Sequence, residues 1–557
     1  MSAKKILALV LALVLCVGTL AACQQTPAET TKPAETTKPA ETTKPAETTA
    51  PAETTEPAEL TNLDIYPLDV DHTFKIVTTW DGVETGTNWH KMFDAIGVDV
   101  EWQIAAAEQL PLIMMSEDRP DIFFNASGLT KEQIDEHGRA GNLVNYAEYL
   151  HVMPNLSRLL EENPDLINVV IQDDGAFYRL PTYTFTLGMT QNQFFLRLDH
   201  AKKAGWDRMP ATIEEFLQLC EDLKTAHADV EGYIPMVCNG KEDIQYNGRY
   251  TQFFFPAFGE LMRSDLTTNA AKDTIIAGFA TEQYKNYLEF MHTLYEKGYM
   301  DPDAYNAVSA TSKAKMMEGS ASMNPSATYL LPENFASGEL ELELVPPLSS
   351  QYNDDARWAK PNHYTGKTDY FITTSCPDIE AACRVMDAFY STYEYPINEA
   401  GTIWGICMWK GELNVDFTAD FEAKTFVTLP HEDFDDGRQW AHVAGNGNVF
   451  NLNWPLYEDS GNALTIFNKN VADILYPVGV DVFYLDWLRL TVDEQDIYTD
   501  AWSDVQAYAK EMNAAFITGT KDIDAEWDTY IKTLDEMGLQ DVSGVYQAAL
   551  DRYNAGK

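Results

Sequence analysis

The sequence predicts an α/β protein whose C-terminal half is rich in helix. Short segments rich in β-branched and aromatic residues, at 72–79, 98–104 and 122–124, alternate with amphipathic segments at 87–96 and 108–115. Strands that alternate with helices of this length are typical of a mostly parallel sheet with crossover helices. Three further amphipathic segments near the end of the sequence account for the helix-rich second half.

The later elements follow from local signals. Thr212 is a predicted helix N-cap, and Glu215, three residues on, completes the pattern of a capping box. A second amphipathic helix is predicted over 283–295, ended by Gly298. A strand at 368–373 precedes a helix at 379–393, and the final helices are expected at 502–515, 525–537 and 542–553.

The first 23 residues predict export and lipid attachment. Lys4 and Lys5 precede an apolar run over 6–17, which is shorter than the roughly 20 residues that span a bilayer, so it is typical of a secretory signal. Leu20-Ala21-Ala22-Cys23 resembles the lipobox of bacterial lipoproteins. The resemblance implies that residues 1–22 are removed and that Cys23 carries acyl chains. An ordinary signal peptide with a chance cysteine is the alternative.

Residues 23–60 are predicted to be a disordered tether. The hexapeptide Pro27-Ala28-Glu29-Thr30-Thr31-Lys32 recurs with little change to about Glu59. The repeat has no aromatic or large aliphatic residue, so it cannot bury enough apolar surface to offset its conformational entropy. The regular prolines disfavour helix and sheet and keep the segment extended.

The remaining residues, 61–557, exceed one ordinary domain, and their apolar content is ample for real cores. The formal net charge of −47 would repel nucleic acid and anionic lipid, which excludes nucleic-acid binding and suits a neutral or cationic ligand. Five cysteines follow residue 60, and their irregular spacing does not indicate a disulfide framework. Cys220 lies in an apolar helical pattern and is expected in a core.

Several segments together resemble a protein family. They are Gly175-Ala176-Phe177-Tyr178-Arg179-Leu180-Pro181, the run Arg197 to Phe216, Leu294-Tyr295-Glu296-Lys297-Gly298-Tyr299-Met300-Asp301-Pro302, Gly319 to Met323, Trp527-Asp528-Thr529-Tyr530 and Tyr546 to Tyr553. In order and spacing they are similar to the extracellular solute-binding proteins of bacterial ABC importers, in the carbohydrate-associated group of Gram-positive lipoproteins. Ser322 departs from the alanine of the family's Gly-x-x-Ala-Met turn.

The resemblance implies a two-lobe, type II periplasmic-binding-protein-like fold, in which each lobe is a mixed sheet flanked by helices. The first lobe is expected at about 61–180 and 366–420, and the second at about 190–365 and 421–557. The implied function is capture of a small solute between the lobes and delivery to permease subunits. The protein is then a monomeric receptor, lipid-anchored on the extracellular face of the cell membrane, and it is not an enzyme.

The candidate ligand residues are aromatic and polar side chains at loop positions. Open α/β sheets bind ligands beyond the carboxyl ends of their strands, which selects Trp80, Asp81 and Asn125. The crossing segment adds Tyr178 and Tyr183. Trp404 lies in a glycine-aromatic turn, and Trp440 and Trp454 flank Gly445-Asn446-Gly447-Asn448. Aromatic rings stack on sugar rings, so a carbohydrate is favoured, while peptides and other solutes stay open.

No cofactor or metal site is expected. Some relatives carry a calcium loop after the helix that corresponds to 212–225, but His227 to Tyr233 has too few oxygen ligands for a calcium cage. An extracellular carbohydrate-active enzyme would need paired carboxylates, which the many acidic residues cannot exclude, although no G-x-S-x-G or H-E-x-x-H motif is present. A surface adhesin lipoprotein is the third functional hypothesis.

Overall fold

The computed structural model describes residues 61–80, 87–172, 174–186, 193–259, 261–262, 264–325, 340–360, 363–365, 369–404, 411–429, 450–459 and 463–555. The chain divides into two units, Met1–Glu59 and Leu60–Lys557, and every described residue belongs to the second. The predicted signal, Cys23 and the repeat therefore lie outside the described residues.

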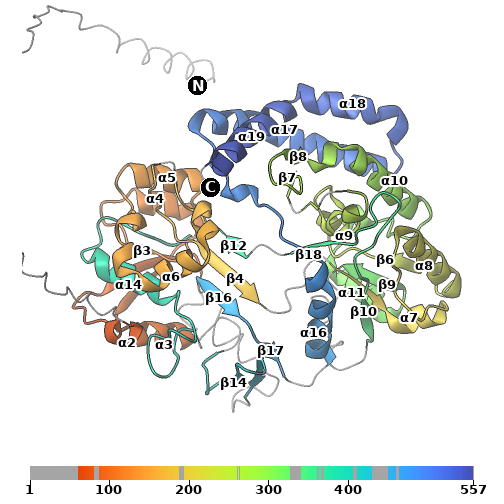
Figure 1. The fold of residues 1–557 in the computed structure, drawn as a ribbon. Helices are drawn as coiled ribbons and strands as arrows, with labels where there is room; N and C mark the ends of the chain where they lie inside the picture. The colour runs from red at the N-terminus through yellow and green to blue at the C-terminus, as the bar shows by residue number, and fades with distance from the viewer. Residues whose placement is uncertain are drawn as a thin grey trace, which may run out of the picture. The chain divides into compact units, whose positions relative to one another are not determined.

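The first lobe is built on a four-stranded mixed sheet (Figure 1). In spatial order its strands are β13 (Phe371–Ile372), β3 (Ile122–Phe123), β1 (Phe74–Thr78) and β2 (Val100–Ile104). β1 pairs in parallel with β2 and with β3, whereas β13 runs antiparallel to β3. The strands predicted in the first part of the chain are confirmed, and so is the mainly parallel pairing between them.

Both faces of this sheet are covered along its central strands β1 and β3, whose alternate residues point to opposite faces. Phe74 and Ile76 belong to one apolar cluster, and Val77 to another. Helices α3 (Thr87–Ile96), α6 (Pro154–Glu162) and α14 (Ile379–Ala388) contribute to the first cluster. Helices α4 (Leu110–Met114) and α5 (Lys131–Arg139) contribute to the second. A sheet covered on both faces is what parallel strands require.

The second lobe repeats this plan with a different strand order. Its strands are β10 (Leu342–Leu344), β5 (Phe194–Arg197), β9 (Ala321–Pro325) and β6 (Ile234–Met236). β5 is antiparallel to both neighbours, and β6 is parallel to β9. Phe194 and Leu196 face a cluster that includes α8 (Ile213–Ala226), α9 (Arg249–Phe254) and α10 (Glu282–Glu296). Phe195 faces α11 (Ser309–Glu318) and α16 (Ala463–Leu475).

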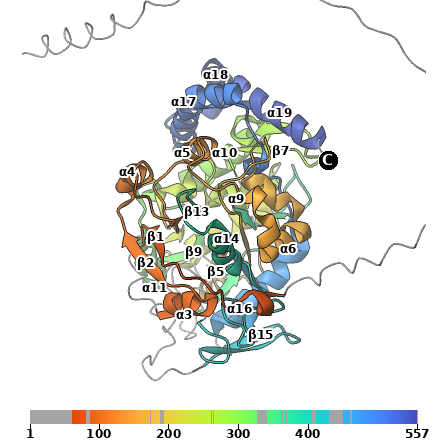
Figure 2. The same cartoon turned by 90° about the vertical axis from the view of Figure 1, so that its left-hand side faces the viewer.

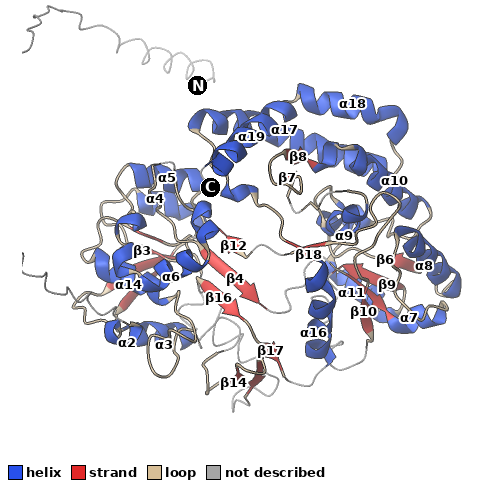
Figure 3. Ribbon diagram, in the orientation of Figure 1, coloured by secondary structure: helices blue, strands red, loops and turns tan. Residues whose placement is uncertain are grey.

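Three long helices complete the second lobe and make the end of the chain mainly helical (Figure 3). They are α17 (Val492–Ile517), α18 (Ile523–Glu536) and α19 (Leu539–Ala555). Each adds buried side chains to the large second-lobe cluster, as Val505, Leu534 and Val542 show. All three were expected from the sequence, although α17 begins well before residue 502. Cys220 is also fully buried in this cluster, as predicted.

Three short strands form a separate sheet between the two groups of elements (Figure 1). The turned view of Figure 2 has the first-lobe elements, such as β1, β2 and α3, in front. We call it the crossing sheet. Its central strand is β4 (Thr182–Thr186), which pairs antiparallel with β12 (Tyr364–Thr365) and parallel with β16 (Asn451–Trp454). β4 continues towards β5 of the second lobe, and β12 continues towards β13 of the first. The chain therefore passes between the lobes along paired strands.

The smaller elements lie beside these sheets. Strands β14 (Phe417–Asp420), β15 (Thr425–Thr428) and β17 (Tyr457–Glu458) form a three-stranded sheet. Phe417 packs in the core of the first lobe, and so do Phe426, Phe450 and Leu456, which lie beyond residue 420. Two further sheets have two strands each. One is the hairpin of β7 (Leu266–Thr268) and β8 (Ile275–Ala277), and the other pairs β11 (Trp358–Ala359) with β18 (Gly479–Val480). The lobe boundaries stay a prediction.

Two local expectations need correction. Thr212 does cap α8, since its hydroxyl accepts a hydrogen bond from the Glu215 amide at 3.2 Å. The reciprocal bond of the capping box is missing, because the Glu215 carboxylate accepts from the Ala211 amide and from Arg208 instead. Helix α14 ends at Ala388 rather than near residue 393. The Tyr390 hydroxyl beyond this end donates to the Pro181 carbonyl, just before the crossing sheet.

A buried carboxylate joins three parts of the first lobe. Asp387, on α14, accepts hydrogen bonds from the Leu156 amide at 2.8 Å and from the Asn155 amide and side chain at 3.1 and 2.8 Å. These amides belong to the first turn of α6, whose N–H groups have no partner within the helix. Asn155 also exchanges two side-chain hydrogen bonds with Asn62 of α2 (Asn62–Ile65). Burial raises the pKa of Asp387 to about 7.

We expect Asp387→Asn to lower the free energy of unfolding by about 1–3 kcal/mol, because its amide group would face N–H donors. The folded-state pKa lies above the carboxyl group's ordinary value of 3.8, so the wild type loses stability as pH rises from that value towards about 7. The difference between wild type and variant should therefore shrink as pH rises through this window. Thermal unfolding at several pH values checks this, with the exposed Asp528→Asn as a control. A constant difference would contradict it.

Candidate ligand site

The loops that follow β1 and β3 meet at the carboxyl edge of the first-lobe sheet. The Thr79 hydroxyl donates to the Asn125 carbonyl at 3.0 Å, and the Trp80 amide donates to the Thr78 hydroxyl at 3.2 Å. Asp369, which precedes β13, accepts at its carbonyl from the Ala126 amide. Parallel sheets characteristically bind ligands at this edge.

Trp80 and Asn125 are both partly exposed at this edge. The Trp80 ring lies 5.6 Å from the ring of Trp89, tilted by 58°. Trp89 is itself buried in the first-lobe core, so it supports the Trp80 ring from behind. Asn125 has a φ of +49°, a conformation that asparagine tolerates better than most residues. Asp81 lies outside the described residues.

Tyr183 lies on the central strand of the crossing sheet and is half-buried. Its ring is 5.8 Å from that of Tyr364, which is its partner in the β4–β12 ladder. His363 fixes the same region, because its Nδ1 lies 2.9 Å from the Thr184 carbonyl and its ring lies 5.2 Å from Phe185. Burial, and then the neighbouring Tyr364, raises the pKa of Tyr183, so its hydroxyl stays protonated and can donate a hydrogen bond.

Other predicted aromatic residues are buried. Trp404 and Trp454 are each 5% exposed, and their rings stack at 5.3 Å with an angle of 13°. The structure thus brings these two residues together within the first-lobe core. Tyr178 is 7% exposed, and its ring fills the space over Gly138, where a Cβ atom would come within 2.2 Å of Cδ2. Trp440 and residues 445–448 lie outside the described residues.

Sequence reasoning missed His363, Tyr364 and Asp369 as neighbours of this site. Tyr364 belongs to the two-residue strand β12, and His363 directly precedes it; a strand this short gives no periodic signal. Asp369 is one of many acidic residues, and only the fold shows that its carboxylate accepts a hydrogen bond from the Ser127 hydroxyl at 2.6 Å.

Aromatic packing occupies the segment where a calcium loop was considered. The His227 ring stacks on Tyr233 at 4.6 Å and lies 4.3 Å from the His200 ring. In the described part of the chain, no three His, Cys, Asp or Glu side chains are grouped so that they could hold a metal ion. None of the helices in the described ranges is both long enough and apolar enough to cross a bilayer.

Comparison with known proteins agrees with this architecture. Residues 80–392 match the model of the bacterial extracellular solute-binding protein family. The fructooligosaccharide ABC transporter substrate-binding protein FusA of Streptococcus pneumoniae is 24% identical over 487 residues, which are 83% of this chain and 86% of FusA.

Solved structures show the same fold. The structure of S. pneumoniae FusA in complex with kestose has a TM-score of 0.66 at 20% identity and covers 87% of this chain and all of that one. A solute-binding protein from Bifidobacterium longum infantis, described as binding HMO, has a TM-score of 0.67 at 15% identity, with 87% and 99% covered. The chain has the two-lobe type II fold and belongs to the bacterial extracellular solute-binding protein family.

Proposed function

We propose that this chain is a receptor that captures an oligosaccharide between its two lobes and delivers it unchanged to the permease of an ABC importer. The observation that carries the proposal is the match to a fructooligosaccharide-binding protein along most of both chains. The solved structures of similar fold support it, since one of them holds kestose. A receptor that releases its ligand intact is not an enzyme.

The geometry of the candidate site supports a carbohydrate ligand. Trp80 and Tyr183 each combine an aromatic face with partial exposure, and each is supported by a second ring. Such rings can cover the apolar faces of sugars, while Asn125 and Asp369 offer polar groups for hydroxyls. These groups come from the first-lobe edge and from the crossing sheet, so a ligand that touches both lies where the lobes meet.

The crossing sheet supplies the mechanism of capture. Hinges in domain closure are a few residues that absorb the change in backbone angles while the packed lobes move as units. Here each lobe has its own buried core on both sides of its sheet. We infer that a ligand that contacts both lobes favours the closed form by its differential affinity, and that the permease recognises this form.

The proposed location is the extracellular face of the cell membrane. The sequence pattern supports this location: an apolar signal is followed by a cysteine after small residues and by a proline-rich repeat. Acyl chains on Cys23 would hold the receptor near its transporter, because each buried CH₂ contributes about 0.8 kcal/mol.

We expect one oligosaccharide from a panel of fructo-, malto- and milk-type oligosaccharides to raise the melting temperature without being consumed. A ligand at 100 times its Kd stabilises the folded state by about 2.7 kcal/mol. Thermal unfolding detects the shift, and chromatography of the sugar after incubation shows whether it is intact. Cleaved sugar would support an enzyme, and the absence of any shift across the panel would contradict carbohydrate capture.

A pair of substitutions at Asn125 separates binding from backbone strain. Asn125→Ala should cost about 1 kcal/mol of stability, since alanine is disfavoured at positive φ, whereas Asn125→Gly should cost less. Both variants lose the side-chain amide, so both should bind the stabilising oligosaccharide equally weakly in calorimetry. Unchanged affinity in Asn125→Gly would remove Asn125 from the proposed site.

The anchor has a direct cellular test. Cys23→Ala should move the protein from the membrane fraction to the culture medium, because the thiol that accepts the lipid is gone. Immunoblotting of membrane and medium fractions, in cells that lack the permease, measures this. A Cys16→Ala variant, altered within the signal, is the control and should remain membrane-bound. Retention of Cys23→Ala at the membrane would exclude this anchor.

A further inference from the structure

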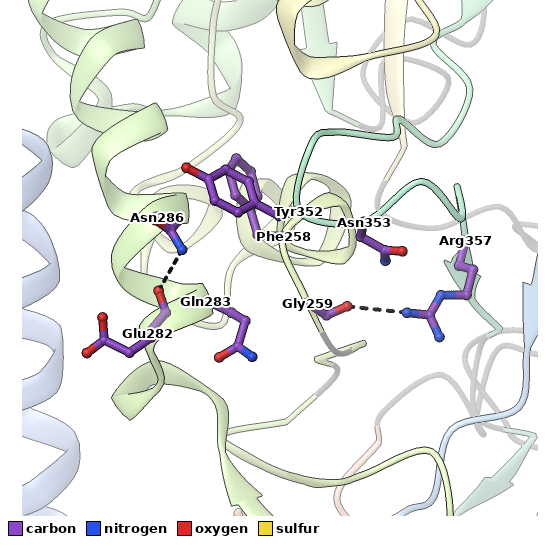
Figure 4. Close-up of a pocket in the computed structure, with 8 residues that line it drawn as sticks. All are labelled: Phe258, Gly259, Glu282, Gln283, Asn286, Tyr352, Asn353 and Arg357. Carbon is purple, nitrogen blue, oxygen red and sulfur yellow. Dashed lines mark hydrogen bonds between the residues drawn. The ribbon is translucent and has the colours of Figure 1, made fainter.

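A pocket of about 390 Å³ lies in the second lobe, and its lining residues include none of the ligand residues predicted from the sequence (Figure 4). Cavities of about 300–1,000 Å³ are typical of small-molecule sites. The pocket lies between the first turns of α10, the end of the 3₁₀ turn that follows α9 and the loop before β11. The side chains that matter here are Phe258, Gln283, Asn286, Tyr352, Asn353 and Arg357.

One wall is an exposed aromatic ring on a buried base. Tyr352 is 49% exposed, and its ring lies 5.6 Å from that of Phe258, tilted by 32°. Phe258 is only 4% exposed and packs against Phe290 of α10 at 5.7 Å. Figure 4 shows the two rings one over the other at the edge of the pocket. Tyr352 thus presents a supported apolar surface.

The loop that carries Tyr352 is fixed in place. The Ser350 hydroxyl donates to the Ala257 carbonyl at 2.5 Å and accepts from the Tyr352 amide at 3.0 Å. The Asn353 side chain donates to the Pro256 carbonyl at 2.8 Å. A ring held in this way loses little conformational freedom when a ligand packs on it, which favours binding.

The rest of the pocket lining is mainly polar. Gln283 is exposed, and its side-chain amide makes no hydrogen bond to any described residue. It can reach the pocket because Gly259 has no side chain: a Cβ atom there would lie 2.9 Å from Gln283 Cβ and Cγ. Asn286 donates to the Glu282 carbonyl at 3.1 Å, which leaves its carbonyl oxygen as an acceptor. Arg357 donates to the Gly259 carbonyl at 3.4 Å and pairs with Asp355.

These groups define the chemistry of a ligand. Arg357, the cation among the described lining residues, lies 3.4 Å from the Asp355 carboxylate and is paired with it, and Glu282 accepts a hydrogen bond from Trp527 Nε1 at 2.9 Å. An anionic ligand group would therefore gain little binding free energy from these side chains. A neutral ring with one apolar face and several hydroxyls matches a pocket that combines an aromatic surface with two side-chain amides, and this description fits a saccharide unit.

The pocket also lies near the crossing sheet along the chain. Arg357 and Tyr364 are separated by seven residues, which span at most about 25 Å when fully extended. A long oligosaccharide at the crossing sheet is therefore within reach of the pocket.

We propose that this pocket holds one distal ring of a long oligosaccharide, stacked on Tyr352 and hydrogen-bonded by Gln283 and Asn286. The inference rests on the proposed function and adds a site that selects ligands by chain length. Short ligands occupy only the region of Trp80 and Tyr183, while longer ones gain contacts in the second lobe.

The test compares ligands of different length by calorimetry, with kestose as the short probe and longer fructooligosaccharides as the extended ones. The variants are Tyr352→Ala, Tyr352→Phe and Gln283→Ala, with Glu296→Ala, exposed at the other end of α10, as the matched control. Tyr352→Ala should bind the long probe about tenfold more weakly and kestose as the wild type does. Tyr352→Phe should keep the affinity, because the stacking face remains, and Gln283→Ala should lose part of it.

The outcomes separate the two proposals. Wild-type affinity of Tyr352→Ala for every probe would overturn the pocket and leave the receptor function standing. An equal loss for short and long probes would also overturn it, since Tyr352 would then act through the fold of the lobe. If the wild type binds neither probe, nor any member of the wider oligosaccharide panel, the receptor function fails and the pocket proposal fails with it.

Discussion

The pairing of β4 with β12 and β16 is the constraint on which the architecture depends. Each lobe closes its own core around a sheet whose central strands are covered on both faces, so neither core fixes the position of the other. Two backbone hydrogen bonds join distant parts of the chain at one place. The Tyr183 amide donates to the Phe450 carbonyl, and the Thr184 amide donates to the His363 carbonyl. Two further hydrogen bonds lie beside the crossing sheet: Arg489 donates to the Asn168 side chain, and the Tyr553 hydroxyl donates to Asp165. A ligand receptor needs rigid lobes and a narrow connection, and this sheet supplies the connection.

Elements with a strong local signal were predictable from the sequence. The first three strands, α3, α8, α10 and the last three helices follow from periodicity and from capping residues such as Thr212. The prediction was wrong where long-range contacts decide. Glu215 bonds to Ala211 and Arg208 rather than completing a capping box, and Tyr390 leaves the helix pattern to bond the Pro181 carbonyl. Neither contact is visible from sequence spacing.

The candidate site was only partly predictable for the same reason. The rule that ligands lie beyond the carboxyl ends of strands placed Trp80 and Asn125 on one edge. The rule could not show that Trp404 stacks on Trp454, because the sequence around each residue is equally compatible with an aromatic side chain in a loop. The pocket beside Tyr352 left no sequence signal either. Its walls come from segments around residues 258, 283 and 352, and only the packing of α10 against Gly259 brings them together.

The network around Asn62 has a mechanical consequence. The segment before Asn62 is joined covalently to it, and the Asn62 side chain donates hydrogen bonds to Asn155 and to the Tyr395 carbonyl, while Asn155 in turn donates to Asp387. Any tension on the preceding segment therefore enters the interior of the first lobe and bypasses the strands between the lobes. Under the proposed anchoring at Cys23, a force on the segment before Asn62 would load the first lobe and leave the strands between the lobes unloaded, so the second lobe could still close on a ligand.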